Sequence, residues 1–228
     1  MIPWLDPDLP PRFPPTRAAL DEPNGLLAAG GSLEPEWLLA AYRRGIFPWF
    51  SDEEPILWWT PAPRMVLFPD EFHCSRSLRK FLRREPYRIT VNRRFADVML
   101  ACAEPRPGQP GSWINGPMLR AYKRLHALGH AHSWECWDAS DRLVGGLYGV
   151  SIGRVFFGES MFSRADNASK ACLKSLAEEG GYGLIDCQMH TDHLASLGAR
   201  EISRSAFEEQ LRTLLDQPRL PGEETTPD

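Results

Sequence analysis

The sequence predicts a mixed α/β fold in which three consecutive strands lead into a helix and then into one further strand. Two observations support this prediction. The chain has 228 residues, of which 43% are hydrophobic and 11% aromatic, enough for a substantial core. Segments with apolar residues at helical spacing also alternate with short apolar runs that are typical of strands.

Residues 1–63 are expected to form a small N-terminal domain. The first 15 residues contain six prolines, which favour an extended or irregular path. Ser32 then precedes a segment, residues 34–45, with apolar side chains at helical spacing and a terminal glycine, so a helix is expected there. The prolines within residues 61–63 mark the expected boundary of this domain.

Residues 64–215 are expected to form a second, larger domain. Its predicted helices lie at residues 75–85, around 95–99, and at 116–129, 166–180, 191–197 and 204–214. Its predicted strands lie at residues 87–92, 131–138, 142–152, 154–162 and 184–189. Residues 104–116 are expected to form a loop, and the tail at 216–228 is expected to be disordered.

This order of elements is that of the central part of the GNAT acyltransferase fold, so a GNAT-like α/β (α+β) domain is expected. An acetyl-CoA enzyme would need a glycine-rich loop before the helix to hold the pyrophosphate. The corresponding loop here, FSRADNASK (162–170), has no glycine, so the usual cofactor is not expected. Four residues of the loop are left to bind another polar or anionic group: Ser163, Arg164, Asn167 and Ser169.

Charge is distributed unevenly along the chain. The formal net charge is −4, which argues against a protein that is basic throughout. Between His73 and Arg94, however, eight basic residues accompany a single acidic one. Such a block predicts contact with a polyanion, and the alternative is a solvated helix face with acidic neighbours from elsewhere in the fold. Five of these cations lie in the predicted helix at 75–85: Arg76, Arg79, Lys80, Arg83 and Arg84.

Cysteine and histidine patterns give little support for a metal site. The five cysteines include no Cys-x-x-Cys pair, and the chain has neither a signal-peptide pattern nor an apolar run of about 20 residues. These features predict a reduced protein of the cytoplasm rather than a membrane protein. Two sets of residues have ligand-like spacing but no fourth ligand nearby, Cys187 with His190 and His193, and His126 with His130. No metal and no other cofactor is therefore expected.

One predicted strand carries two polar residues that packing does not explain. In LIDCQ (184–188), Asp186 and Gln188 are two residues apart, and the alternation of side chains along a strand puts them on one face. Asp and Gln are costly to bury unless they are paired. The pair therefore predicts a cleft that handles polar or charged groups.

Several long segments resemble one known family. They are EPNGLLAAGGSLEPEWLLAAYRRGIFPWF (22–50), ILWWTPAPR (56–64), GSWI (111–114), AYKRLHALGHAHSWE (121–135), LVGGLYG (143–149), FGESMFSRADNASK (157–170), LIDCQ (184–188) and DHLASLGA (192–199). These segments resemble the bacterial leucyl/phenylalanyl-tRNA–protein transferases over roughly residues 15–205. That family has a GNAT-like fold preceded by a small N-terminal domain.

The resemblance implies an enzyme that moves Leu or Phe, with Met as a further candidate, from its tRNA to the α-amino group of a protein. The implied acceptors begin with Arg or Lys, and the transfer marks them for degradation. Because an aminoacyl-tRNA ester is already activated, the reaction needs no ATP, metal or CoA. A monomeric enzyme with aminoacyl-tRNA and acceptor proteins as partners is expected.

The resemblance also implies roles for three polar residues. Asp186 would polarise Gln188 through a hydrogen bond, and Gln188 would position the attacking amine or accept its proton. A water or Asp186 itself is an alternative proton acceptor. Glu159 would pair with the N-terminal Arg or Lys of the acceptor, and the alternative is a buried carboxylate satisfied by backbone donors.

Further residues match the family's substrate-binding positions. The transferred side chain would lie in an apolar pocket of Leu147, Phe156, Leu173 and Ile185. The 3′-terminal adenosine of the tRNA would stack on Trp49, Trp113 and Tyr122. The basic helix at 75–85 would hold phosphates of the acceptor stem.

The chain departs from the family pattern in one place. Members often have Asn just after the Asp-x-Gln strand, whereas this chain has Thr191-Asp192-His193, so a role for an amide there is not supported. Two other interpretations remain open. One is an acetyl-CoA-dependent N-acetyltransferase of the same fold, and the other is a non-catalytic tRNA-binding module, which would not need Asp186 or Gln188.

Overall fold

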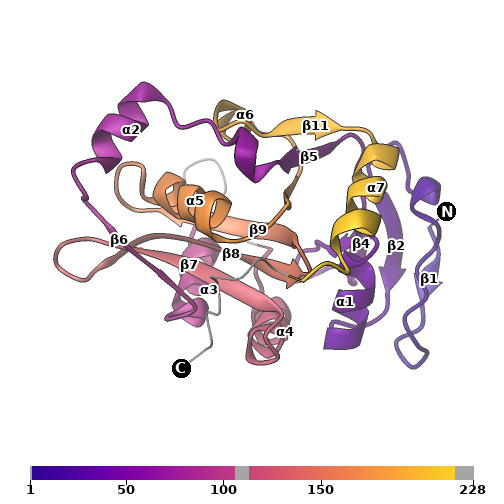
Figure 1. Ribbon diagram of the computed structural model, residues 1–228. Coiled ribbons are helices and arrows are strands. Elements are labelled where there is room, and N and C mark those ends of the chain that lie inside the picture. Colours follow the sequence, from indigo (N-terminus) through magenta and orange to yellow (C-terminus); the bar gives the residue numbers. More distant parts are fainter. Residues whose placement is uncertain (1, 106–112, 219–228) are drawn as a thin grey trace.

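The fold, seen in a computed structural model that describes residues 2–105 and 113–218, consists of two β-sheets with helices around them (Figure 1). The predicted mixed α/β class is therefore confirmed. The predicted tail beyond residue 218 and most of the predicted loop at 104–116 lie outside the described residues. Within the described part of the chain, no helix is long and apolar enough to cross a membrane.

The smaller sheet is built from residues near the N-terminus. Its strands lie in the order β1 (Trp4–Leu5), β2 (Leu26–Gly30), β4 (Leu57–Trp59) and β3 (Phe47–Pro48). Helix α1 (Pro35–Tyr42) connects β2 to β3, and its N-cap residue is Glu34 rather than Ser32. The sequence does not predict these strands, because they are short and their apolar residues do not alternate with polar ones.

The larger sheet has the strand order β11-β5-β10-β9-β8-β7-β6. Five of its strands lie where the sequence predicts them: β6 (Arg88–Val91), β7 (Ala131–Trp137), β8 (Leu143–Ile152), β9 (Val155–Ser163) and β10 (Leu184–Gln188). The other two are β5 (Arg64–Leu67) and β11 (Arg200–Ile202). Strands β6 to β9 form an antiparallel meander, and β10 runs parallel to β9 after the crossover helix α5 (Ala168–Glu179).

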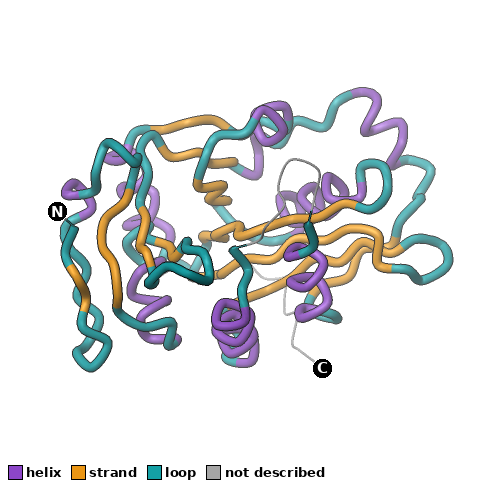
Figure 2. Tube along the Cα trace, turned by 180° about the vertical axis from the view of Figure 1, so that it is seen from behind, coloured by secondary structure: helices purple, strands orange, loops and turns teal. Residues whose placement is uncertain are grey.

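Helices lie on both faces of the larger sheet (Figure 2). Helices α3 (Phe95–Ala103) and α4 (Gly116–Ala127) pack on one face, and α5 packs on the other. The remaining helical elements are α2 (Arg76–Leu82), α6 (Asp192–Ser196) and α7 (Arg204–Leu214), with short 3-10 turns at Thr16–Ala18 and Pro69–Glu71. Four helices begin at side chains that accept a backbone N–H from the first turn, namely Ser75, Asn115, Thr191 and Ser203.

Two apolar cores hold these layers together. One lies between α5 and the sheet and contains Phe156, Leu173 and Ile185. The other contains buried residues of α3 and α4 and continues into the smaller sheet, where Trp58 is completely buried. The two sheets therefore share one continuous core, which fixes α1 and its side chains against the larger sheet.

Candidate active site

A cavity of about 160 Å³ lies at the point where β9 and β10 separate. The pairing of these two strands ends at Phe157 and Asp186, whereas β9 continues along β8 to Ser163. All four residues predicted for the apolar pocket line this cavity, namely Leu147, Phe156, Leu173 and Ile185. The three predicted polar residues line it as well: Glu159, Asp186 and Gln188.

Glu159 reaches the cavity from a β-bulge in β9. On either side of it, Gly158 pairs with Gly149 and Ser160 pairs with Tyr148, so Glu159 is the extra residue of β9. A bulge bends the strand and changes the direction of the extra side chain, and bulges are frequent beside active sites.

A second bulge, in β10, separates Asp186 from Gln188. Asp186 pairs with Val66 and Gln188 pairs with Met65, so Cys187 is the extra residue. Gln188 has a φ of 63°, in the left-handed region that non-glycine residues rarely adopt. Its backbone N–H donates to Oδ1 of Asp186 at 2.9 Å. The expected regular alternation over these two residues is therefore wrong, whereas the two residues do share a hydrogen bond, formed by the backbone N–H of Gln188.

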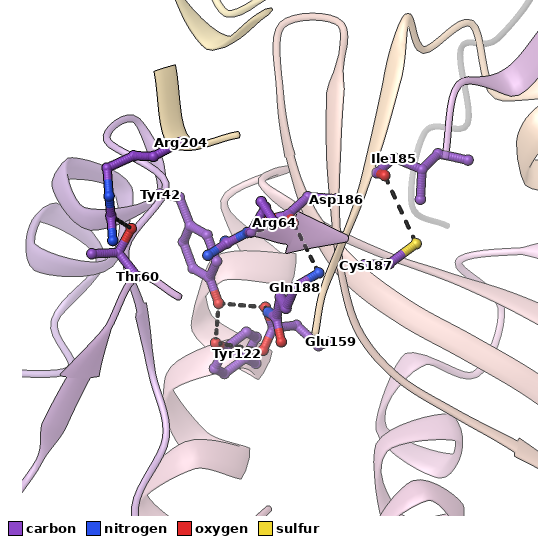
Figure 3. Close-up of polar contacts among 10 residues, drawn as sticks. All are labelled: Tyr42, Thr60, Arg64, Tyr122, Glu159, Ile185, Asp186, Cys187, Gln188 and Arg204. Atoms are coloured by element: carbon purple, nitrogen blue, oxygen red, sulfur yellow. Dashed lines mark hydrogen bonds and ion pairs between the residues drawn. The ribbon is translucent and has the colours of Figure 1, made fainter. Parts of the chain in front are cut away.

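Asp186 is instead paired with an arginine from the neighbouring strand. Nε of Arg64 donates to Oδ1 of Asp186 at 2.8 Å, and Nη2 donates to Oδ2 at 2.6 Å (Figure 3). Both side chains are buried, and the guanidinium carbon lies 4.9 Å from the ring centre of Phe47 and 4.7 Å from that of Phe207. Arg64 was not predicted as a site residue. The only signal for it in the sequence is a cation at the start of the apolar run RMVLF (64–68).

Glu159 is the centre of a hydrogen-bond cluster formed by three other elements (Figure 3). Its Oε1 accepts from the hydroxyl of Tyr42 at 2.6 Å and from Nε2 of Gln188 at 3.0 Å. Its Oε2 accepts from the hydroxyl of Tyr122 at 3.1 Å, and the two tyrosine hydroxyls also contact each other. These donors are side chains from α1, α4 and β10, whereas backbone donors were the alternative expectation.

The surroundings of Glu159 adjust its charge near neutral pH. Burial raises the pKa of Glu159 to about 7, while the hydrogen bonds from Tyr42 and Tyr122 oppose this rise. The negative charge of Asp186 raises the pKa further, and Arg64 lowers it. Burial, followed by the charge of Glu159, raises the pKa values of both tyrosines well above their usual range. The tyrosines therefore stay protonated donors while Glu159 changes its charge.

The three aromatic residues predicted to stack on adenosine are in different environments. Tyr122 is fully buried, with its ring against Tyr148 and its hydroxyl on Glu159, so the prediction that it stacks on a base is wrong. Trp49 is 42% exposed and lies edge-on to Trp59, which leaves part of its surface free for a ligand. Trp113 is half-buried. Neither Trp49 nor Trp113 is among the described residues that line the cavity.

The five cations of the predicted basic helix lie on or directly after α2, and all are exposed. The set is Arg76, Arg79, Lys80, Arg83 and Arg84. None of the ion pairs between described residues involves any of these side chains, so acidic neighbours do not neutralise them. The basic charge of α2 is therefore available to a ligand.

Other polar residues singled out in the sequence are used within the protein. Arg164 forms an ion pair with Glu104, and the hydroxyl of Ser163 accepts the N–H of Ser169. Nδ1 of His126 lies 2.7 Å from the carbonyl oxygen of Ala131. Over residues 2–105 and 113–218 we find no group of three or more His, Cys, Asp or Glu that could hold a metal ion.

Comparison with known proteins identifies the family. Residues 66–212 match the profile of the leucyl/phenylalanyl-tRNA protein transferases, and residues 31–62 match the profile of their N-terminal domain. The chain belongs to this family. The resemblance seen in the sequence motifs is thus confirmed, and the chain is an aminoacyltransferase by family.

Leucyl/phenylalanyl-tRNA–protein transferases of several bacteria align with almost the whole chain. The protein from Chromobacterium violaceum is 59% identical over 224 residues, which are 97% of this chain and 94% of that protein. The protein from Cellvibrio japonicus is 57% identical over 222 residues, with 96% and 94% covered. A solved structure of L-PGS from Bacillus licheniformis covers 78% of this chain and 62% of its own, with 13% identity and a TM-score of 0.41, too low to establish a common fold.

Proposed function

We propose that this protein transfers leucine or phenylalanine from aminoacyl-tRNA to the α-amino group of proteins that begin with Arg or Lys, marking them for degradation. The observation that carries the proposal is the composition of one cavity, in which an apolar pocket adjoins Glu159 and Gln188. The apolar part suits the donor side chain, and the carboxylate suits a cationic acceptor. Methionine is a further donor candidate, since an apolar pocket discriminates weakly between side chains of similar size.

The proposed reaction forms a C–N bond, breaks a C–O bond and transfers one proton. The acceptor nitrogen attacks the ester carbonyl carbon, the bond from that carbon to the 3′ oxygen of the tRNA breaks, and a proton passes from the amine to the departing oxygen. An α-amino group has a pKa near ~8, so the site must favour its neutral form and hold it against the ester. Transfer of an already activated acyl group requires no cofactor.

The proposed roles of the polar residues follow from their contacts. Because Nε2 of Gln188 donates to Glu159, the amide oxygen of Gln188 is left to accept an N–H of the attacking amine. Glu159 would bind the cationic side chain of the acceptor. Asp186 would act indirectly, since it accepts the backbone N–H of Gln188 while Arg64 neutralises it.

The tRNA would be bound outside the cavity. The exposed cations of α2 would hold phosphates of the acceptor stem, and Trp49 and Trp113 would stack on the 3′-terminal adenosine. One chain contains all the proposed groups, so we infer a monomeric enzyme of the cytoplasm, where aminoacyl-tRNA is made. We also propose that residues 64–215 are a GNAT-like domain behind an N-terminal domain of residues 1–63. The meander β6–β9, followed by α5 and the parallel strand β10, supports this assignment.

A transfer assay with labelled substrate tests the proposal. Radiolabelled Leu-tRNA is incubated with the protein and either of two acceptors that differ only in an N-terminal Arg or Ala. Label is expected on the Arg acceptor alone. Label on neither acceptor would contradict the proposal, and uptake of label from acetyl-CoA would favour an N-acetyltransferase.

Normal transfer by the Asp186→Ala variant would contradict the proposed role of Asp186.

Reversing the charge of the basic helix is expected to weaken tRNA binding. In a variant with Arg76, Arg83 and Arg84 changed to Glu, the affinity for Leu-tRNA at low salt should fall by at least about tenfold. The slope of log affinity against log salt should become shallower by about two to three, since each phosphate contact contributes close to one. Binding isotherms at four salt concentrations measure both quantities. The matched control is Arg142→Glu on the β7–β8 turn, and an unchanged slope in the triple variant would remove the role of α2.

Enlarging the apolar pocket is expected to change donor preference. Leu173→Ala should raise kcat/KM for Phe-tRNA relative to Leu-tRNA by about tenfold, because the larger ring gains the space that the leucine side chain loses. Competition between the two charged tRNAs measures this ratio directly. Leu214→Ala on α7 is the control, as it removes a buried leucine that does not line the cavity. Equal ratios in both variants would show that Leu173 does not contact the donor.

A further inference from the structure

A second cavity, of about 580 Å³, lies between the N-terminal segment, the end of α1 and helix α7. We call it the arginine cavity, because five arginines and only two carboxylates line it. The arginines are Arg17, Arg43, Arg44, Arg204 and Arg212, and the carboxylates are Glu208 and Asp216. Arg212 also pairs with Glu209 at 2.5 Å, which still leaves an excess of positive charge in a chain with a formal net charge of −4.

Two half-buried arginines at this site are held by neutral partners. Arg44 donates to the carbonyl oxygens of Phe13 and Pro14 at 2.7 and 2.6 Å, and Arg204 donates to the hydroxyl of Thr60 at 3.1 Å. These hydrogen bonds fix the guanidinium groups, and the nearby charge of Glu208 only partly offsets the effect of their burial. Burial lowers the pKa of both arginines, so an anion in the cavity would stabilise their charged forms.

The remaining charged groups leave room for an anion at the rim. Arg17 is exposed and has no ion-pair partner among the described residues. Arg43 pairs with Asp216 at 3.1 Å, but both side chains are more than half exposed, so this contact is weak. The charge of Glu208 raises the pKa of both held arginines, and its carboxylate also accepts from the hydroxyl of Thr16.

We propose that the arginine cavity binds a small phosphorylated molecule with at least two negative charges. The guanidinium fork matches phosphate oxygens, and several guanidinium groups around one cavity favour a multiply charged group over a single carboxylate. The volume lies within the range of small-molecule sites, and Leu211, Leu215 and Pro15 provide an apolar wall for the uncharged part of such a ligand.

The arginine cavity is separate from the catalytic cavity, since the two have no lining residue in common. Helix α7 lines the arginine cavity and also packs on a residue of the active site. Arg204 lines the arginine cavity, and Phe207, one turn further along α7, packs on the Arg64 that holds Asp186. The proposed site is thus additional to the aminoacyl-transfer site and does not depend on the function proposed for it.

Calorimetric titration of the full chain with inorganic pyrophosphate and with ADP tests the proposal. Binding is expected with a dissociation constant in the millimolar range or tighter. Arg17→Glu should weaken it by about tenfold or more, and Glu208→Gln should strengthen it several-fold, because the two substitutions change the charge of the cavity in opposite directions. Arg142→Glu is the control and should bind like the wild type.

Three results would overturn the proposal. The first is no binding of either probe at 5–10 mM, roughly the limit of a weak site. The second is equal binding by the Arg17→Glu and wild-type proteins, which would put the probe elsewhere. The third is a loss of affinity for uncharged tRNA in Arg17→Glu without any binding of pyrophosphate or ADP, which would assign the cavity to the phosphates of tRNA.

Discussion

Arg64→Met is expected to lower the free energy of unfolding by about 3–5 kcal/mol, the largest stability effect that we anticipate for a single substitution. Arg64 and Asp186 are both fully buried and joined by two hydrogen bonds. Removing the guanidinium leaves the carboxylate of Asp186 without its partner in a place that water does not reach, and an uncompensated buried charge is costly. Urea unfolding of wild type and variant measures the difference.

The double variant Arg64→Met with Asp186→Leu is the informative control. Replacing both members of a buried ion pair by apolar residues of similar size is often nearly neutral for stability. The double variant should therefore regain most of the lost stability while transfer stays low, because the backbone N–H of Gln188 has lost its acceptor. Equal destabilisation of the single and double variants would mean that packing between Phe47 and Phe207, rather than charge, makes Arg64 important.

Glu159→Gln is expected to lower kcat/KM for an acceptor with N-terminal Arg by about 10–100-fold at pH 8, the largest effect on recognition that we anticipate. The substitution keeps the size of the side chain, removes its charge and replaces one acceptor oxygen by an NH2 group. An acceptor that begins with citrulline, the uncharged analogue of arginine, is the control and should lose far less. Equal losses for the two acceptors would show that Glu159 does not bind the cation.

The same comparison should depend on pH in a defined direction. With a pKa of about 7, Glu159 is ionised to about nine-tenths at pH 8 and about one-tenth at pH 6, so the advantage of wild type over Glu159→Gln should shrink as pH falls. The ratio of the two enzymes removes the titration of the acceptor amine, which is common to both. A ratio that stays constant between pH 6 and pH 8 would contradict the proposed role.

Stability provides an independent readout for Glu159. Because its folded-state pKa is raised, the folded protein holds the proton more tightly than the unfolded chain, and stability falls as pH rises from about 4.5 to 7. The Gln variant lacks this titration, so its stability should fall less than that of the wild type between pH 4.5 and pH 8. Loss of transfer with unchanged stability would separate recognition from folding.

The order of elements was predictable from local pattern, whereas the residues of the cavity were predicted from the family resemblance. Strand and helix periodicity located β6 to β10 and α5, and these elements bring Leu147, Phe156 and Leu173 together. Periodicity is informative here because each of these elements buries one face against a neighbour. Apolar residues therefore recur every two residues in the strands and every three to four residues in the helix.

The partners of the polar residues could not be predicted in this way. Tyr42 and Tyr122 reach Glu159 from helices 117 and 37 residues earlier, and Arg64 reaches Asp186 from an antiparallel strand 122 residues earlier. Such contacts depend on which strands become neighbours, and the spacing of apolar residues within one segment does not predict strand order. The basic character of α2 was visible in the sequence, but the burial of Tyr122 was not, since an aromatic residue at helical spacing is compatible with a core or with a surface.

The two bulges determine which face of the sheet the polar side chains of the site lie on. In a regular strand, whether a side chain faces one side or the other depends on whether its position is odd or even, and each bulge reverses that rule once. Strands β9 and β10 contain one reversal each, at Glu159 and at Cys187, and Gln188 donates to Glu159 with both reversals in place. Loss of Cys187 would restore the regular count of β10 and turn Gln188 away from Glu159. The meeting of Glu159 and Gln188 is therefore sensitive to chain length as well as to residue identity, and a one-residue deletion could separate them without changing either.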